Sequence, residues 1–257
     1  MKLRNISFIL LFTIVTGVLF SGCKKDDDDE TTPAPTPNAV QRFGFHMHSM
    51  VGTSAAAYGT TFTDNSGRKF NLADFRFYIS NVVLIKDDGS EYPFTNKVIL
   101  VNPTTNEYDL GDAPVGSYKG FKFILGLDSA TNHSDPSTYA ASNPLSIQSP
   151  SIHWTWNSGY IFMKVEGQVD TTLANTGTPN YDFFYHIGMD MFKRNIDFST
   201  EAFTIVSGSD KEIGLEFDLL EMLSNVDMRT ENETHTMNNM PLATKIADNW
   251  SSAFTIE

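Results

Sequence analysis

The sequence predicts an all-β protein, a β-sandwich of the Ig-like or Greek-key type with a short C-terminal helix. From about Val40 onward, short segments alternate apolar and polar residues, the pattern of half-buried strands. Gly, Asn, Asp and Pro separate these segments, as they do in turns. The long helices that a βαβ fold needs between its strands do not appear in the pattern.

The alternation is clearest in four segments, each of which places its apolar side chains on one face of a strand. A polar run from Lys86 to Ser90 has the composition of a hairpin turn between two strands. Many short strands joined by polar turns are typical of a sandwich. The four apolar sets are Phe75, Phe77 and Ile79; Phe121, Phe123, Leu125 and Leu127; Ile161, Met163 and Val165; and Ile213, Leu215 and Phe217.

Two segments predict helix. Residues 218–223 form a short apolar turn. From Pro241 to Phe254, the residues Leu242, Ile246 and Trp250 recur at every fourth position and so share a helix face. Pro241 is acceptable at the first helical position. Because no internal repeat is found, residues 40–257 are predicted to form one domain.

The amino-acid composition excludes several classes of function and of binding site. The 257 residues carry a formal charge of −13, and 40% of them are hydrophobic, which is enough for a core. A negative chain repels phosphate, so nucleic acid is not an expected partner. A single Cys excludes intramolecular disulfides and Cys-rich metal sites.

Residues 1–22 have the pattern of a signal peptide. Lys2 and Arg4 precede an apolar stretch from Ile6 to Phe20, and small residues precede Cys23. This arrangement resembles the lipobox of bacterial lipoproteins, although Phe20 is a looser fit than the usual aliphatic residue. The resemblance implies that Cys23 becomes the lipidated first residue and anchors an outer-membrane lipoprotein. The alternative is an uncleaved N-terminal anchor.

Residues 23–39 are expected to form an acidic and Pro-rich tether. The charges of Asp26 to Glu30 repel one another, and Pro33, Pro35 and Pro37 favour an extended backbone. Acidic residues directly behind a lipidated Cys resemble the surface-export signal of Bacteroidetes lipoproteins. A hydrophilic spacer facing the periplasm is the alternative.

Familiar catalytic motifs are missing from the sequence. It contains no Gly-x-Gly-x-x-Gly, Walker loop, Gly-x-Ser-x-Gly or His-Glu-x-x-His. Carboxylates are plentiful, so no acid–base pair can be singled out. We therefore expect a binding protein rather than an enzyme.

Histidine and tryptophan gather in short groups. His46 and His48 would share one face of a strand, about 7 Å apart, and so could ligate one metal ion. The alternative is a pair of polar surface residues. Trp154 and Trp156 would also share a face, where such side chains fill a core or stack on sugars.

Two further groups combine histidine with methionine. His186 lies close to Met189 and Met191, and His235 lies close to Met237. Imidazoles bind copper and zinc, and thioethers prefer soft ions such as Cu(I). The methionines are explained equally well as core residues, and His235 as a residue at the start of a helix.

Taken in order, these groups resemble the MbnP family of periplasmic copper-binding proteins, which are associated with methanobactin operons and have relatives among Bacteroidetes lipoproteins. The strings Tyr78-Ile79-Ser80-Asn81 and Trp154-Thr155-Trp156-Asn157-Ser158-Gly159-Tyr160 are the most specific. The matching segments are Phe45–Gly52, Phe77–Val82, Gly116–Tyr118, Phe123–Asp128, His153–Tyr160, Tyr185–Gly188 and His235–Met237.

The resemblance implies one copper ion, favoured as Cu(I), bound by two histidines and by a kynurenine that a MauG-like diheme peroxidase makes from a tryptophan. An intact indole nitrogen is a donor only, whereas the opened ring offers an aryl amine. The metal ligands would be His48 or His46 together with His186. The modified residue would be Trp154 or Trp156.

Other residues would lie beside this metal or act as alternative ligands, namely His153, His235 and Met189. The protein would scavenge copper or pass it to an importer, for which a TonB-dependent outer-membrane importer is the expected type. A second class of function stays open. In it, Trp154, Trp156 and Tyr160 form the stacking platform of a cell-surface carbohydrate- or protein-binding module.

Overall fold

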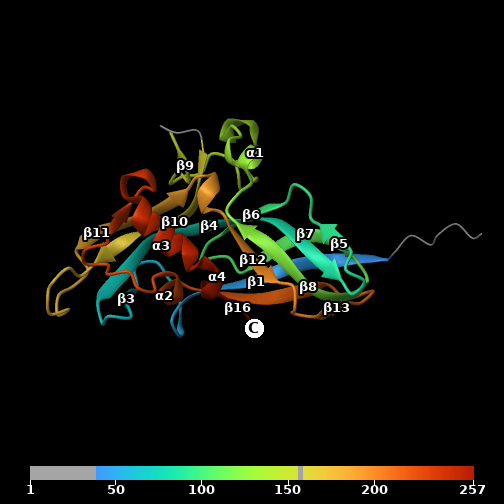
Figure 1. The fold of residues 1–257 in the computed structure, drawn as a ribbon, viewed down its shortest axis with the longest axis horizontal. Helices are drawn as coiled ribbons and strands as arrows, with labels where there is room; N and C mark the ends of the chain where they lie inside the picture. The colour runs from blue at the N-terminus through green and yellow to red at the C-terminus, as the bar shows by residue number, and fades with distance from the viewer. Residues whose placement is uncertain (1–38, 156–158) are drawn as a thin grey trace, which may run out of the picture. The chain divides into compact units, whose positions relative to one another are not determined.

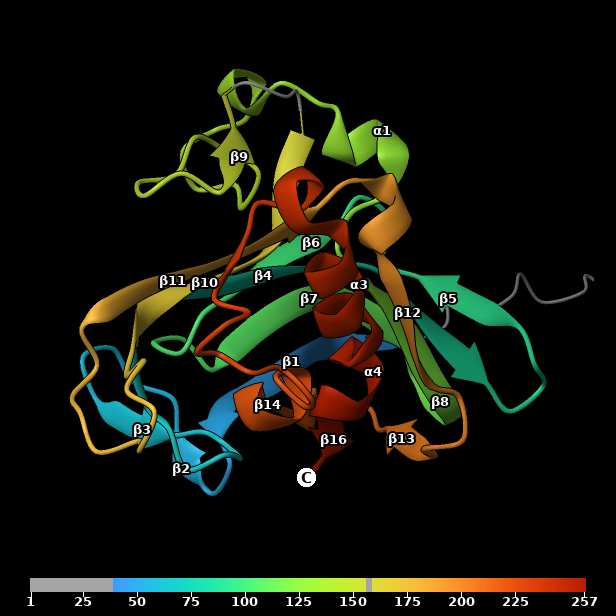
Figure 2. The same cartoon turned by 60° about the vertical axis from the view of Figure 1, so that its left-hand side comes forward.

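The computed structural model describes residues 39–155 and 159–257, and within these ranges the strands form two sheets (Figures 1 and 2). The predicted signal peptide, Cys23, nearly all of the predicted tether, and Trp156 lie outside the described residues. A membrane-spanning helix, judged by length and apolar character, is not found within the described ranges.

Sheet A is centred on β1, which pairs in parallel with β14 and antiparallel with β2 and β7. The last strand, β16, pairs with β14. The parallel pairing joins segments that are far apart in the sequence and places His46 opposite Gly214. The strands of sheet A are β1 (Val40–Val51), β2 (Ser54–Ala55), β7 (Glu107–Pro114), β14 (Lys211–Asp218) and β16 (Phe254–Ile256).

Sheet B is built around the long strand β4, which pairs with β8 on one side and with β10 on the other. Its main order is β12-β8-β4-β10-β11-β15, and shorter strands pair with β4, β8 and β10. The strands are β3 (Thr61–Thr63), β4 (Lys69–Lys86), β5 (Glu91–Pro93), β6 (Val98–Val101), β8 (Gly116–Leu125), β9 (His153–Trp154), β10 (Gly159–Val169), β11 (Tyr181–Gly188), β12 (Arg194–Phe198), β13 (Phe203–Ile205) and β15 (Glu233–Thr234).

The helices are short. Asp218 and Asn239 cap α2 and α3, accepting hydrogen bonds from Leu220 N and Leu242 N. The helices are α1 (Ser129–Asn132), α2 (Leu219–Met222), α3 (Met240–Asp248) and α4 (Trp250–Ala253), with 3-10 turns at Pro136–Thr138, Asp190–Phe192 and Met237–Asn239.

The predicted C-terminal helix is confirmed as α3 and α4, but its predicted end is wrong. Phe254 has an extended backbone and begins β16. Its ring lies 4.9 Å from that of Phe217 and 5.2 Å from that of Phe123. Burial between the two sheets therefore draws this residue out of the helix.

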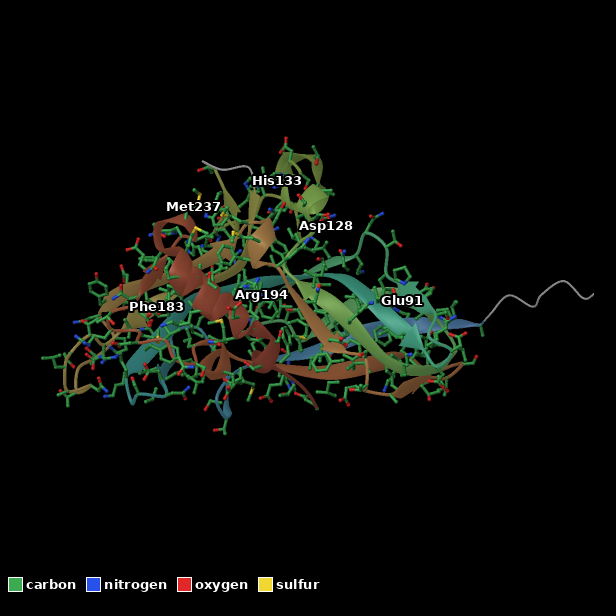
Figure 3. The ribbon with its side chains drawn as sticks, viewed as in Figure 1. Glu91, Asp128, His133, Phe183, Arg194 and Met237 are labelled. Atoms are coloured by element: carbon green, nitrogen blue, oxygen red, sulfur yellow. The ribbon has the colours of Figure 1, made fainter. Side chains whose placement is uncertain are left out.

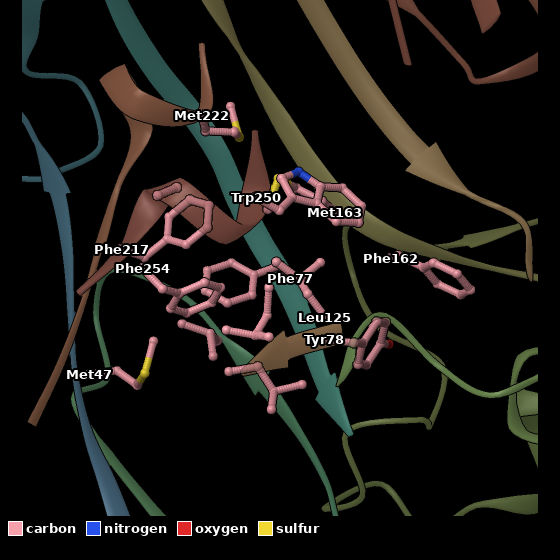
Figure 4. Packing of buried hydrophobic residues seen from close by; sticks show 14 of the residues in the cluster. Met47, Phe77, Tyr78, Leu125, Phe162, Met163, Phe217, Met222, Trp250 and Phe254 are labelled. Atoms are coloured by element: carbon pink, nitrogen blue, oxygen red, sulfur yellow. The ribbon is translucent and has the colours of Figure 1, made fainter. Parts of the chain in front are cut away.

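Aromatic side chains fill the space between the sheets (Figure 4). Phe77 of sheet B lies 4.8 Å from Phe217 of sheet A, measured between ring centroids. Phe45 of sheet A lies 5.6 Å from Phe121 of sheet B. All members of the four predicted apolar sets are buried. The predicted sandwich is therefore confirmed, and so is the turn at Lys86–Ser90, where Lys86 N donates to Ser90 O.

Alternation along the strands fixes which side chains leave the core. In β1, Phe45 and Met47 are buried, so His46 points out of the opposite face of sheet A. In β11, Tyr185 and Ile187 are buried, so His186 belongs to the outer face of sheet B. The two outer faces are thus on opposite sides of the aromatic core.

Candidate metal centres

Four of the six histidines form two pairs, one on the outer face of each sheet. In each pair two ring nitrogens lie 2.9 Å apart, and the ring centroids lie 4.6 Å apart. We call His186 with His235 the sheet B pair, and His46 with His48 the sheet A pair. Two imidazole nitrogens that approach this closely can share one metal ion.

Strand pairing creates the sheet B pair. Strand β15 runs parallel to β11 with Thr234 opposite Tyr185. The next residues, His186 on β11 and His235 directly after β15, therefore lie side by side. Their Nδ1 atoms face each other at 2.9 Å. Thr236 reinforces the junction, because its Oγ1 donates to His186 O at 2.8 Å.

A buried ion network orients the ring of His186. Its Nε2 lies 2.7 Å from Glu166 Oε1, and Lys164 Nζ lies 3.1 Å from the same oxygen. Burial by itself would raise the pKa of Glu166, but the hydrogen bonds from His186 and Lys164 outweigh it and lower this pKa to about 2. Glu166 therefore stays ionised and accepts the Nε2 proton, which leaves the Nδ1 lone pair facing His235.

Two effects favour the neutral form of His235. Burial lowers its pKa, and the nearby charge of His186 lowers this pKa further. Its Nε2 lies 3.8 Å from Glu233 Oε1. Neutral imidazole is the form that ligates metals, so these effects favour His235 as a ligand.

Trp154 lies on the same outer face as the sheet B pair. A Cβ on Gly188 would lie 2.6 Å from the Trp154 ring and 2.4 Å from Tyr160 O, so only glycine allows this contact. Gly188 follows His186 by two residues, which places both on one strand face about 7 Å apart. Trp154 is 5% exposed. The indole is therefore buried against the strand that carries His186.

A cavity of about 320 Å³ adjoins this indole. It is lined by Trp154, Gly159, Met189, Met191, Asn132, His133 and Asp190. Figure 2 shows β9 and the beginning of α3 on the side of the described domain away from β1 and β14. Met237, which follows His235 closely, and His133 are labelled on that same side in Figure 3.

Carboxylates surround the sheet A pair. His46 Nδ1 lies 2.5 Å from Glu107 Oε1, and His48 Nδ1 forms an ion pair with Glu257. Glu212 brings a third carboxylate, and its ligand atom lies within 4.8 Å of those of His46 and Glu107. This site therefore offers a mixture of nitrogen and oxygen ligands.

The sequence predicted that His186 and either His46 or His48 bind the same metal ion. The structure does not bring them together. The side chains of His46 and His48 project from the outer face of sheet A, and that of His186 projects from the outer face of sheet B. The partner of His186 is His235, one of the expected alternatives. The fold thus separates the expected single site into two.

The other expected residues lie near the sheet B pair without joining it. The ring of His153 packs edge-on against Tyr160, with centroids 4.8 Å apart, and burial lowers its pKa. Met189 lines the cavity beside Trp154. Tyr160 is fully buried and donates its hydroxyl to Leu145 O. Because Trp154 and Tyr160 are buried, the expected sugar-stacking platform is not formed by these two residues.

Three carboxylates that contact the rings of His46, His48 and His186 were not predicted from the sequence. Glu107 and Glu257 are 61 and 209 residues away from their histidines, and no local pattern marks them. Glu166 had a weak signal, because it alternates with Val165 on a strand and belongs to the polar face. Only strand pairing selects these three from the 31 acidic residues.

The family model described as MbnP matches residues 40–240. MbnP from Methylosinus trichosporium is a solved structure with the same fold, at a TM-score of 0.53 and 17% sequence identity. The similarity covers 74% of this chain and 80% of that chain. A search of curated proteins found no match.

Proposed function

This chain belongs to the MbnP family, and we propose that it is an extracytoplasmic, non-catalytic protein that binds one Cu(I) between His186 and His235. The observation that carries the proposal is the 2.9 Å separation of the two Nδ1 atoms. One ion can span this separation with bonds of about 2 Å to each nitrogen.

The donors suit a soft, singly charged ion. Burial favours the neutral form of His235, and the nearest carboxylates lie beside the outer Nε2 atoms rather than the facing Nδ1 atoms. Neutral nitrogen donors in a small number favour Cu(I) over hard cations. Glu166 has the role that carboxylates have behind metal-binding histidines, which is to fix the ring and increase its basicity.

Trp154 is the tryptophan that we propose for conversion to kynurenine, with Trp156 as the alternative. An intact indole nitrogen cannot ligate a metal well, because its lone pair belongs to the ring. Oxidative opening adds two oxygen atoms across the indole C2–C3 bond, and hydrolysis then releases C2 as formate. The freed aryl amine adds a third neutral donor. A MauG-like diheme peroxidase is the proposed catalyst, and its oxidant is two molecules of hydrogen peroxide, which are reduced to water.

The proposed location follows from the N-terminal segment. Lipid on Cys23 anchors the protein to the outer membrane, with the domain facing either the periplasm or the cell surface. There the protein scavenges copper without turnover and passes it to an importer, for which we propose a TonB-dependent outer-membrane protein.

Cu(I) competition tests the proposal. The full-length protein, purified in detergent and kept reduced and anaerobic, is titrated against a chromophoric Cu(I) chelator. The parent protein should bind about one tightly held Cu(I), and the double variant His186→Gln/His235→Gln should lose it. His133→Gln, an exposed histidine outside both pairs, is the matched control. Full Cu(I) binding by a folded double variant would refute this site.

Mass spectrometry of the native protein tests the modification separately. The peptide that contains Trp154 should show the net exchange of one carbon atom for one oxygen atom. An unmodified Trp154 together with an altered Trp156 would move the modification to the alternative position. If both tryptophans are unmodified in copper-loaded native protein, the kynurenine proposal fails, and the two-histidine site is judged by the titration alone.

A further inference from the structure

We propose that the sheet A pair is a second metal site, which binds a divalent transition ion, Cu²⁺ in preference to Zn²⁺, through the Nε2 atoms of His46 and His48. Glu107, Glu212 and Glu257 supply the negative charge around it. This site lies on the sheet opposite to the proposed Cu(I) site and is independent of it.

The orientation of both rings supports the proposal. Each Nδ1 contacts a carboxylate, Glu107 for His46 and Glu257 for His48. A carboxylate on Nδ1 fixes the proton there and turns the Nε2 lone pair toward the metal, which is the usual arrangement behind metal-binding histidines. Here the arrangement occurs twice, and the two Nε2 atoms converge to 2.9 Å with ring planes at 86°.

Two Nε2 lone pairs at this distance repel each other unless something positive lies between them. A shared proton satisfies one pair of electrons at a time, whereas a metal ion accepts both. Glu107, Glu212 and Glu257 further favour a cation. In the part of the chain that the structure describes, the ion pairs of Glu107 and Glu257 are with these histidines, and Glu212 has no ion pair.

The backbone of sheet A assembles this site from three separate strands. Glu107 of β7 is directly opposite His46 of β1. On the other side of β1, the register partner of His46 is Gly214 of β14. A Cβ at position 214 would lie 3.0 Å from Glu257 Oε2, so the missing side chain makes room for Glu257 to reach across to His48. Figure 2 shows β1, β14 and β16 side by side.

The charge around the pair selects the kind of ion. Imidazole nitrogens bind both Cu²⁺ and Zn²⁺, and the three carboxylates around these rings favour a doubly charged ion over Cu(I). Divalent copper binds such sites more tightly than zinc does. The side chains of His46 and His48 are 33% and 39% exposed, so the ion reaches them directly from solvent.

The test uses full-length protein in detergent that carries His186→Gln/His235→Gln, which removes the sheet B pair. This background is stripped of metal with a chelator and titrated with Cu²⁺, and electron paramagnetic resonance reports nitrogen coupling. We expect one equivalent of Cu²⁺ with nitrogen ligands. Adding His46→Gln/His48→Gln should abolish the nitrogen-coupled signal.

Single variants test the carboxylates. Glu107→Gln and Glu257→Gln should each weaken Cu²⁺ binding by roughly 10- to 100-fold. Asp112→Asn, an exposed carboxylate on the same strand as Glu107, is the matched control and should bind like the background. In a parallel titration, Zn²⁺ should occupy the same site more weakly and displace no bound Cu²⁺.

Either of two results would overturn the proposal. One is a Cu²⁺ spectrum with oxygen ligands alone, and the other is a nitrogen-coupled signal that survives His46→Gln/His48→Gln. Neither result affects the Cu(I) site, which is tested separately. That test is Cu(I) competition on a His46→Gln/His48→Gln protein whose sheet B pair is intact. Circular dichroism before each titration confirms that the variants are folded.

Discussion

The Nδ1 atom of His186 lies 2.9 Å from the Nδ1 atom of His235, which is 49 residues further along the chain. The sheet A pair has the same spacing but uses the other ring nitrogen, Nε2. In both pairs the nitrogen that faces away is directed at a carboxylate. The position of that carboxylate therefore decides which nitrogen is left for a metal.

Glu166→Gln is expected to weaken Cu(I) binding by about 10- to 100-fold, because a neutral amide fixes the His186 ring less firmly and no longer increases its basicity. Competition with a Cu(I) chelator measures the change. Asp182→Asn, an exposed carboxylate on the same strand as His186, should leave the affinity unchanged. An unchanged affinity in a folded Glu166→Gln protein would show that Glu166 does not support the ligand.

Gly188→Ala is expected to lower the free energy of unfolding by about 1–3 kcal/mol, because the added methyl group overpacks the Trp154 ring and Tyr160 O. Urea denaturation measures the loss, and tryptophan emission should shift toward that of an exposed indole. In Gly208→Ala no neighbour lies within 4 Å of the new methyl group, and the left-handed backbone alone costs about 1–2 kcal/mol.

The emission of the Gly208→Ala control should therefore stay at the parent wavelength. If both variants lose similar stability without any spectral shift, Trp154 does not pack against position 188.

The folded protein is expected to lose stability as pH rises from about 10 to about 12. Burial raises the pKa of Tyr108 and Tyr160 from 10.0 to about 12, and it also raises the pKa of Tyr78 and Tyr185. Because the unfolded chain ionises first, these phenols stabilise the fold fully below pH 10, and this contribution disappears as the pH passes the folded values.

Phenolate absorbance and urea denaturation across this pH range measure the effect. In denaturant, all nine tyrosines should titrate together. A single titration step near pH 10 in the folded protein would show that these tyrosines are exposed, as the carbohydrate-binding alternative requires of Tyr160.

Phe77→Ala is expected to cost about 3–5 kcal/mol, because it leaves a cavity between the sheets beside Phe217. Urea denaturation measures the loss. Tyr181→Ala, at a 52% exposed position on β11, should change the stability by no more than about 0.5 kcal/mol. A small loss for Phe77→Ala would mean that the two sheets do not pack through this ring.

Much of the fold was predictable because alternation is local. The burial of Phe75, Phe77 and Ile79 follows from a pattern that can be read within a few residues. The end of the last helix was not predictable in this way. Phe254 leaves the helix because it packs between two strands that are distant in sequence, and no helical pattern records that contact.

Part of the candidate site was predictable as well. His46 and His48 share a face because they are two residues apart on a strand, and the pair is found as expected. The sequence named His235 only as one of several alternative ligands. Its pairing with His186 could not be predicted, because it depends on the parallel register of β15 with β11.

By itself, the sequence determined the strand pattern, the sandwich, the resemblance to the MbnP family and the side chains able to hold a metal, because each of these depends on residues close together in the chain. The tertiary structure decided how many sites those side chains make. Opposite faces of a two-sheet core cannot meet, so His186 and the N-terminal histidines belong to different sites, each completed by carboxylates that only strand register brings near.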